Sequence, residues 1–172
     1  MDILQRFARI TTFVFDVDGV LTDGTVLLLE NGVQARRMNI KDGLALQLAA
    51  KNFRVVIVSG AYAEPVLQRL QYLGLTHIFL GTKDKMGFLK SYVHEHNIDL
   101  NTVLYMGDDL PDMSVLQCVG LACCPADAVG EVKNVCHYIS PKKGGDGCVR
   151  DVIEYVLKLN GNWHGETNLV SQ

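Results

Sequence analysis

Two aspartates stand at the end of a short, strongly apolar segment near the start of the chain. Residues 12–15 read Thr-Phe-Val-Phe, a β-branched and aromatic run that predicts a buried strand, and Asp16 and Asp18 follow it. Side chains two residues apart on an extended chain point the same way, so the two carboxylates would lie together. Close carboxylates repel each other, and a bound divalent cation is the simplest remedy. For this fragment alone, a calcium loop and a solvated turn are alternatives.

Size and composition favour one globular domain. The chain has 172 residues, 48% of them hydrophobic, with a net charge of −3, which argues against nucleic acid as the main partner. Its five cysteines are odd in number and show no Cys-x-x-Cys spacing, so we expect reduced thiols rather than disulfides or a zinc site. No apolar run approaches the ~20 residues that span a bilayer. The first residues lack a secretion-signal pattern, so we expect a cytoplasmic protein with no membrane partner.

Strand-like and helix-like segments alternate along the chain. Runs rich in Val, Ile, Leu and Phe predict strands, and longer stretches with apolar residues three or four apart predict helices. This alternation implies a doubly wound α/β fold, a Rossmann-like parallel sheet whose ligands bind at the carboxyl ends of the strands. We expect strands at 12–15, 53–58, 77–80, 102–106, 119–122 and 137–139, and helices at 63–73, 84–95, 111–116 and 147–159.

One segment breaks the alternation. Residues 25–29 and 33–40 flank an Asn-Gly pair, which predicts a β-hairpin. Because it follows the aspartates directly, this hairpin should project over them as a flap. No interval between predicted strands is long enough for a cap domain. We therefore expect a single domain over residues 1–159, with the flap at about 25–40, and a weakly structured polar tail at 160–172.

Polar residues follow four successive predicted strands, and in a parallel sheet these strand ends are neighbours. Their carboxylates suit a hard cation, and a hydroxyl with backbone N–H groups suits phosphate oxygens. Magnesium keeps several waters and leaves room for a phosphate oxygen, and phosphoryl transfer depends mainly on positioning and charge neutralisation. The residues are Asp16, Asp18, Ser59, Lys85, Asp108 and Asp109.

The order of these motifs resembles the haloacid dehalogenase superfamily of phosphatases. The motifs are Asp-Val-Asp-Gly-Val at 16–20, Val-Ser-Gly at 58–60, Lys85, and Gly-Asp-Asp-Leu-Pro-Asp at 107–112. Each motif alone is weak, but all four in this order are specific and cover most of the domain. The resemblance implies a magnesium-dependent enzyme that passes through an aspartyl-phosphate.

The likeness extends to a small branch of the superfamily without a cap domain. It rests on the hairpin, on Lys-Asp-Gly at 41–43 and on Gly-Gly-Asp-Gly-Cys-Val-Arg at 144–150. This branch includes phosphatases of 3-deoxy-D-manno-octulosonate 8-phosphate and of nonulosonate 9-phosphates. Its members are typically homotetramers in which a neighbour's hairpin and C-terminal tail help to cover the active site. The resemblance therefore implies a homotetramer, and leaves open whether the 144–147 loop acts in its own or a neighbouring subunit.

The resemblance assigns roles to individual residues. Asp16 would be the nucleophile, and Asp18 would protonate the leaving oxygen and later activate water. Magnesium would be held by Asp16, Asp108 and the backbone carbonyl of Asp18, with Asp109 anchoring its waters. Two further groups, Ser59 and Lys85, would bind the phosphate and balance its charge.

Substrate contacts are also carried over by position. Asn39, Gln47, Gly60 and Arg69 would face the substrate, and the planar guanidinium of Arg69 suits a sugar-acid carboxylate. One position departs from the family pattern: an arginine often follows the Ser/Thr-Gly of the second strand, but this chain has Ala61. The contact that this arginine would make with the carboxylate or a hydroxyl of the substrate must be missing or supplied elsewhere.

Simpler interpretations exist for several of these residues. Lys85 alone could be a solvated helix residue, and Ser59 could cap the following helix. Asp112 could cap the Pro111 helix or form an ion pair there, or it could support the site directly. Asp42 is by default a turn residue, or it has a role in the site.

Three classes of function fit the sequence to different degrees. The first is a phosphatase of an acidic keto-sugar, with 3-deoxy-D-manno-octulosonate 8-phosphate as the foremost substrate, in lipopolysaccharide precursor synthesis, and a sialic acid or related nonulosonate 9-phosphate as the alternative. The second is a phospho-accepting regulatory domain, but its acceptor Asp would end the third strand, where this chain has Leu80-Gly81-Thr82. The third is an inactive homologue, which both Asp16 and Asp18 argue against.

Overall fold

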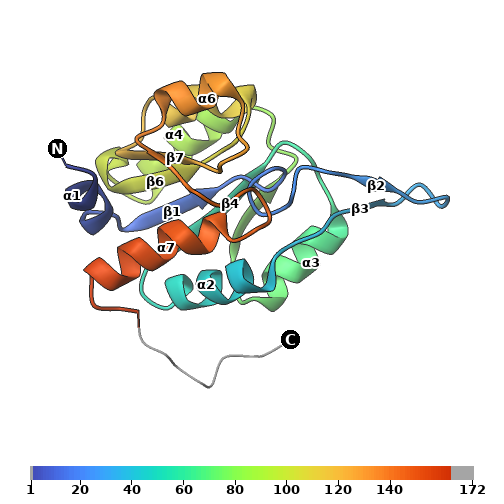
Figure 1. The fold of residues 1–172 in the computed structure, drawn as a ribbon, viewed down its shortest axis with the longest axis horizontal. Coiled ribbons are helices and arrows are strands. Elements are labelled where there is room, and N and C mark those ends of the chain that lie inside the picture. Colours follow the sequence, from blue (N-terminus) through green and yellow to red (C-terminus); the bar gives the residue numbers. More distant parts are fainter. Residues whose placement is uncertain (1, 164–172) are drawn as a thin grey trace.

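A six-stranded parallel sheet forms the centre of the molecule (Figure 1). The computed structural model describes residues 2–163, and the strand order is β5-β4-β1-β6-β7-β8. Every neighbouring pair runs parallel, which confirms the doubly wound α/β fold. The strands are β1 (Thr12–Phe15), β4 (Arg54–Ser59), β5 (His77–Leu80), β6 (Val103–Met106), β7 (Leu121–Cys124) and β8 (Tyr138–Ile139).

Helices cover both faces of the sheet. One layer contains α2, α3 and α7, and the opposite layer contains α4 and α6 (Figure 1). The α-helices are α1 (Ile3–Ala8), α2 (Ile40–Ala50), α3 (Glu64–Tyr72), α4 (Lys85–Glu95), α5 (Met113–Leu116), α6 (Gly130–Val135) and α7 (Cys148–Leu159). Two single 3₁₀ turns, η1 (Leu100–Thr102) and η2 (Leu110–Asp112), precede β6 and α5.

The central strand β1 feeds a separate core on each face. Phe13 and Phe15 pack into the cluster that contains Leu46 of α2 and Val152 of α7. Val14, between them, packs into the cluster on the α4 side. Because side chains alternate along a strand, one short segment serves both cores and is buried at every position.

Within residues 2–163, the hairpin projects from this body. Strands β2 (Leu27–Leu28) and β3 (Gln34–Ala35) form a separate antiparallel pair that projects beyond α3 (Figure 1). The amide of Gly32, with φ of 79°, donates to the Leu29 carbonyl and closes the turn. The predicted second strand, 33–40, was too long, because Asn39 caps α2 and Ile40 already belongs to that helix.

Other boundaries also differ from the sequence prediction. Helices α1, α2 and α6 were not predicted, and the segment expected at 119–122 is strand β7 at Leu121–Cys124. The strand begins later than expected because Gly120 is still bound to η1. Its N–H donates to the Leu100 carbonyl, and it lies against the backbone of Asn101. Most of the predicted polar tail lies outside the described residues. Among the residues described, no helix is long and apolar enough to cross a membrane.

Candidate active site

The predicted site residues meet at the carboxyl ends of three adjacent strands. Asp16 follows β1, Ser59 ends β4, and Asp108 lies two residues beyond β6. The backbone N–H of Asp16 donates to the Met106 carbonyl at 3.0 Å, which continues the sheet pairing to the first carboxylate. The fourth group, Lys85, begins α4, which Asp84 caps by accepting from the Gly87 N–H. The sheet topology therefore brings residues far apart in sequence to one edge.

Lys85 is the cation at the centre of this group. Its Nζ lies 2.8 Å from Asp16 Oδ2 and 2.7 Å from Asp112 Oδ1, and all three side chains are nearly or fully buried. It is therefore not the solvated helix residue that its position alone would suggest. Burial alone would lower the pKa of Lys85, but the neighbouring carboxylates of Asp16 and Asp112 outweigh it and raise that pKa, so the ammonium stays charged.

Asp112 is a member of the site that sequence reasoning left undecided. Its Oδ1 also accepts from the Tyr105 hydroxyl at 2.6 Å, and its Oδ2 accepts from the Asp108 N–H at 3.1 Å. It also closes a capping box with Asp109 around η2. Asp112 therefore caps this turn, forms an ion pair and belongs to the site. The signal was present in the sequence, because a carboxylate three residues after Asp109 suits a capping box.

Three carboxylates converge where a cation would bind. Oxygen atoms of Asp16, Asp108 and Asp112 lie within 4.8 Å of one another. Asp108 lies so close over Gly19, which has φ of 81°, that any side chain there would collide with its carboxylate. Three carboxylates beside one ammonium leave an excess of two negative charges when all are ionised. A hard divalent ion such as Mg²⁺ fits both this charge and the all-oxygen donor set.

Without such an ion, the cluster resists full ionisation. Burial raises the pKa of Asp16 to about 7, with Asp112 adding to the rise and Lys85 and the Val17 N–H opposing it. Burial likewise raises the pKa of Asp108 to about 7, with Asp16 and Asp112 adding to it. Both shifts express the cost of crowding anions in a dry site, and that cost favours a bound cation.

The carboxylate of Asp18 does not join this cluster. The flap residue Arg36 binds it through Nε at 2.6 Å and Nη2 at 3.3 Å. The Arg36 side chain is only 7% exposed, whereas that of Asp18 is 36% exposed. Sequence reasoning did not find Arg36, because the neighbouring Arg37 has the same side chain and only the fold shows which of the two reaches Asp18.

Ser59 ends β4 and lines a small recess together with Asp18 and Arg36. Its side chain is buried, and its Oγ accepts from the Ala61 N–H at 3.3 Å. It is not the cap of α3, a position that Ala63 occupies. The next residue, Gly60, is exposed at the same turn.

The residues expected to face the substrate are dispersed. Arg69 lines a cavity of about 300 Å³ beneath the hairpin, which Arg36 also lines. Asn39 caps α2 and donates to the Gly145 carbonyl at 3.4 Å, so both ends of its side chain are engaged. Gln47 is half-buried further along α2.

The Gly144–Gly147 loop packs on the segment that follows Asp18, residues 19–23 of the same chain. The Gly145 N–H donates to the Val20 carbonyl at 3.0 Å, and a side chain on Gly144 would collide with the backbone of Gly19. Asp42 is not a turn residue: it lies in the first turn of α2 and accepts from the N–H groups of Gly147 and Arg150. Burial raises the pKa of Asp42 to about 6, while these two N–H groups lower it.

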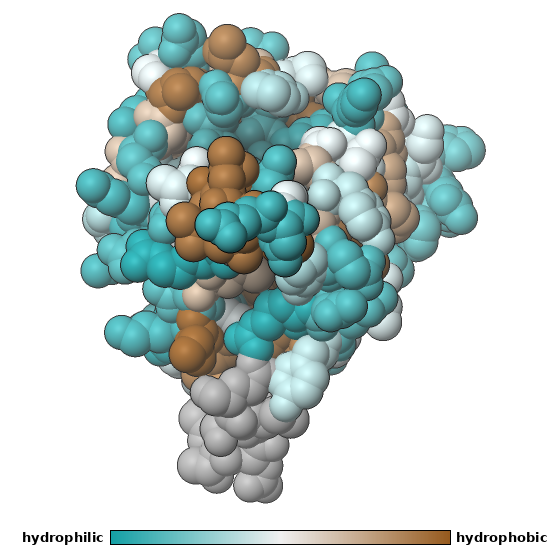
Figure 2. Space-filling model, turned by 90° about the vertical axis from the view of Figure 1, so that its right-hand side faces the viewer, coloured by the Kyte–Doolittle hydropathy of each residue, from teal (hydrophilic) through white to brown (hydrophobic). Residues whose placement is uncertain are grey.

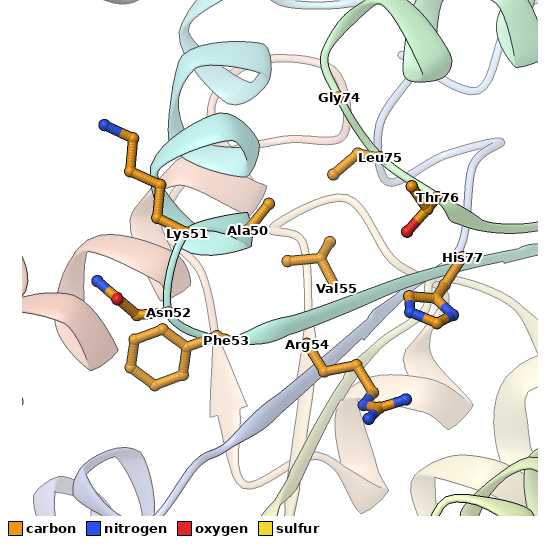
Figure 3. A pocket seen from close by; sticks show the side chains of 10 residues that line it. All are labelled: Ala50, Lys51, Asn52, Phe53, Arg54, Val55, Gly74, Leu75, Thr76 and His77. Atoms are coloured by element: carbon orange, nitrogen blue, oxygen red, sulfur yellow. The ribbon is translucent and has the colours of Figure 1, made fainter.

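A second hollow, of about 350 Å³, lies at the opposite edge of the sheet (Figure 3). It adjoins Arg54 and His77, which begin β4 and β5. In Figure 3 the polar ends of Lys51 and Arg54 point away from the hollow, while Val55 and Leu75 face it. It lies at the amino ends of these strands, whereas the active site of an α/β fold lies at the carboxyl ends.

Comparison with known proteins agrees with this geometry. The profile of the haloacid dehalogenase-like hydrolases matches residues 72–153. The 3-deoxy-D-manno-octulosonate 8-phosphate phosphatase KdsC of Yersinia pestis is 33% identical over 98% of this chain and 90% of its own length. The same enzyme of Escherichia coli K12 is 32% identical over 93% of this chain and 86% of its own.

Solved structures show the same relationship. The crystal structure of the Yersinia pestis phosphatase superposes with a TM-score of 0.91 at 32% identity, covering 95% of this chain and 89% of that one. The Moraxella catarrhalis phosphatase, solved with magnesium, phosphate and 3-deoxy-D-manno-octulosonate (KDO), has a TM-score of 0.89 at 33% identity, covering 94% of this chain and 93% of that one.

Proposed function

Because the chain belongs to the haloacid dehalogenase-like hydrolases and is a phosphoric monoester hydrolase, we propose that it removes the phosphate of an acidic keto-sugar, 3-deoxy-D-manno-octulosonate 8-phosphate. The observation that carries this proposal is the group of Asp16, Asp108 and Asp112 around Lys85 at the strand ends. Relatives of similar length and fold carry this activity in their names, and one was solved with magnesium, phosphate and KDO.

Magnesium is the cofactor that fits the acidic cluster. Asp16, Asp108 and the carbonyl of Asp18 would hold it, Asp109 would anchor its waters, and Asp112 would fix Lys85 and the Asp108 backbone beside it. When bound, the ion supplies positive charge that offsets the charge developing on the transferred phosphoryl group.

The chain's own residues divide the reaction into two steps. An oxygen of Asp16 attacks phosphorus while the bond to the sugar oxygen breaks, and Asp18 gives that oxygen a proton. Asp18 then takes a proton from water, which attacks the aspartyl-phosphate and releases inorganic phosphate and free Asp16. Ser59 and the Gly60 N–H would hold phosphate oxygens, and Lys85 would balance charge in both steps.

The far end of the substrate would lie beneath the hairpin. Arg69 lines the cavity there and would pair with the sugar carboxylate. Asn39 and Gln47 would lie along the approach from α2. Such a substrate would place the enzyme in lipopolysaccharide precursor synthesis, and we expect it to act in the cytoplasm.

We expect the active assembly to be a homotetramer. The hairpin exposes large apolar side chains to solvent, with Leu27 64% and Leu28 74% exposed. Figure 2 looks onto the end of the molecule from which the hairpin projects, and apolar side chains gather near the middle of that face. Such a surface is characteristic of a contact between subunits.

A substrate comparison tests this function. Phosphate release would be measured from 3-deoxy-D-manno-octulosonate 8-phosphate, from a nonulosonate 9-phosphate and from a neutral hexose 6-phosphate, each with Mg²⁺ and with EDTA. The largest kcat/KM should belong to the 8-phosphate, and EDTA should abolish all three rates. Preference for the 9-phosphate would support the phosphatase activity but would replace the proposed substrate. Absence of turnover on all three with Mg²⁺ would overturn the proposal.

A further inference from the structure

The phosphate-binding end of the site is short of positive charge. A phosphate monoester brings up to two negative charges, but Lys85 is already bound to two carboxylates. The turn after β4 carries no cation either, because Ala61 there offers only a methyl group. A second cation would have to come from another part of the chain.

Arg36 is positioned to be that cation. Its side chain reaches from the hairpin into a small recess that Asp18, Ser59 and Ala61 also line. It is nine-tenths buried, although its residue belongs to a projecting flap. Burying a guanidinium is costly unless it is paired, so its position here needs an anionic partner.

The present partner of Arg36 is one that substrate could replace. The Asp18 side chain is 36% exposed, so the ion pair lies at the mouth of the site. The same arginine also lines the larger cavity that Arg69 lines. Arg36 thus lies between the phosphate-binding strand ends and the region expected to hold the sugar.

From these observations we infer that Arg36 is a phosphate-binding residue of the flap. In the free enzyme it pairs with Asp18. When substrate enters, its guanidinium turns to the phosphoryl oxygens, and the carboxylate of Asp18 becomes free to act on the leaving oxygen. This inference rests on the proposed function, because it assigns a partner to the same phosphate.

The exchange has a consequence for substrate range. The phosphate is common to all phosphate monoesters, whereas the sugar carboxylate is not. Arg36 should therefore contribute to the binding of every monoester and of inorganic phosphate, whereas Arg69 should matter only for acidic sugars. This distinction allows Arg36 to be tested with a probe that has no sugar.

The test compares Arg36→Ala and Arg36→Lys with Arg37→Ala in the otherwise intact protein. Arg37 is a matched control, since it is adjacent, carries the same charge, is 76% exposed and pairs with Asp23 away from the recess. Binding of inorganic phosphate would be measured by calorimetry in saturating Mg²⁺, and hydrolysis of p-nitrophenyl phosphate would give KM and kcat. Thermal unfolding would be recorded for each variant.

We expect Arg36→Ala to weaken phosphate binding by roughly tenfold or more, the order of one lost charge-assisted hydrogen bond. KM for p-nitrophenyl phosphate should rise by a similar factor with a smaller change in kcat. Arg36→Lys should be intermediate, because it keeps the charge but not the planar fork, and Arg37→Ala should match the wild type.

Two results would overturn the inference. If Arg36→Ala binds phosphate as well as the wild type or better, the arginine only restrains Asp18 or obstructs the site, while the proposed function stands. If the wild type with Mg²⁺ neither binds phosphate nor hydrolyses the aryl ester, the proposed function fails and this inference fails with it.

Discussion

The strand-end cluster and the hairpin flap are built in opposite ways. In the cluster, Asp16, Lys85 and Asp112 are buried, and each is bound by groups from other elements. In the flap, two strands of two residues each expose leucines, and the Arg36–Asp18 pair joins the flap to the catalytic loop. The cluster is destabilised by repulsion among its buried carboxylates. The flap instead exposes apolar side chains to water.

This difference separates two requirements of a phosphatase. The reacting groups must be held in fixed geometry, and a sheet with paired neighbours on both sides does this. We expect the flap to cover the substrate, and an element with few contacts of its own can open and close more easily than the sheet. The cluster alone carries an excess of negative charge that favours a bound cation, and the flap alone exposes Leu27 and Leu28 to solvent.

The most disruptive change to the cluster is Asp16→Asn. The amide has nearly the same shape but cannot act as the attacking carboxylate, so we expect kcat to fall by roughly 10⁴-fold or more. The fold should persist, because one of the crowded anions has been removed. Phosphate release and circular dichroism measure the two effects.

The exposed cap residue Asp99 offers a control of identical chemistry. Asp99→Asn keeps an acceptor for the Asn101 N–H and lies outside the site, so its turnover should equal that of the wild type. Turnover close to wild type in Asp16→Asn itself would remove Asp16 from the nucleophile role.

Asp112→Ala tests whether Asp112, which is not among the proposed magnesium ligands, holds the cluster together. The change leaves the Tyr105 hydroxyl without its acceptor and Lys85 with one carboxylate, so we expect the free energy of unfolding to fall by about 3 kcal/mol. Activity should fall as well, because Lys85 and the Asp108 backbone lose their anchor. Urea unfolding in EDTA gives the stability, and Asp99→Ala, which removes only an exposed cap, should cost about 1 kcal/mol. Equal losses in the two variants would show that Asp112 is only a cap.

The sequence could predict the strand-end part of this site because its logic is local. Each residue follows a recognisable apolar strand, and parallel pairing brings the carboxyl ends of these strands together. Asp16, Ser59 and Asp108 therefore meet as the pattern indicates. The functional roles of these residues stay predictions.

The parts that the sequence did not predict depend on contacts between distant segments. Helix α2 begins Ile-Lys-Asp-Gly, which is typical of a turn, yet Asp42 binds the start of α7 and helps to fix both helices. Asp112 acquires its role only because η2 returns it beneath Asp108. Arg36 depends on the angle at which the hairpin leaves the body, which no local pattern specifies.

Both the stability of the metal-free cluster and its affinity for magnesium should depend on pH, whereas the flap should not contribute to this dependence. Because the pKa values of Asp16 and Asp108 are about 7 in the folded protein, against 3.8 for an ordinary aspartate, the metal-free fold favours the protonated acids. The free energy of unfolding of the metal-free protein should therefore decrease as pH rises from about 4 to about 7. Magnesium requires both carboxylates in the ionised form, so its affinity should be roughly a hundredfold weaker at pH 6 than at pH 8.

Two measurements check this expectation. Calorimetric titration with Mg²⁺ in buffers of different ionisation enthalpy should show proton release at pH 6 that vanishes at pH 8. Thermal unfolding across the same range should show Mg²⁺ stabilising the protein most above pH 7. Affinity that does not change with pH would mean that the cluster is already ionised without the metal.

The smallest effect on the folded chain should come from the flap. Leu28→Asp places a charge where the side chain is already 74% exposed, so the stability of the subunit should change by less than about 0.5 kcal/mol. The same charge would be buried in a contact between hairpins, so light scattering should show a smaller assembly than the wild type. Glu30→Gln, at the exposed tip of the same hairpin, is the control. If Leu28→Asp assembles like the wild type, the exposed leucines are not the subunit contact. If it dissociates with kcat on p-nitrophenyl phosphate intact, the cluster is complete within one chain and the assembly serves the sugar end of the site.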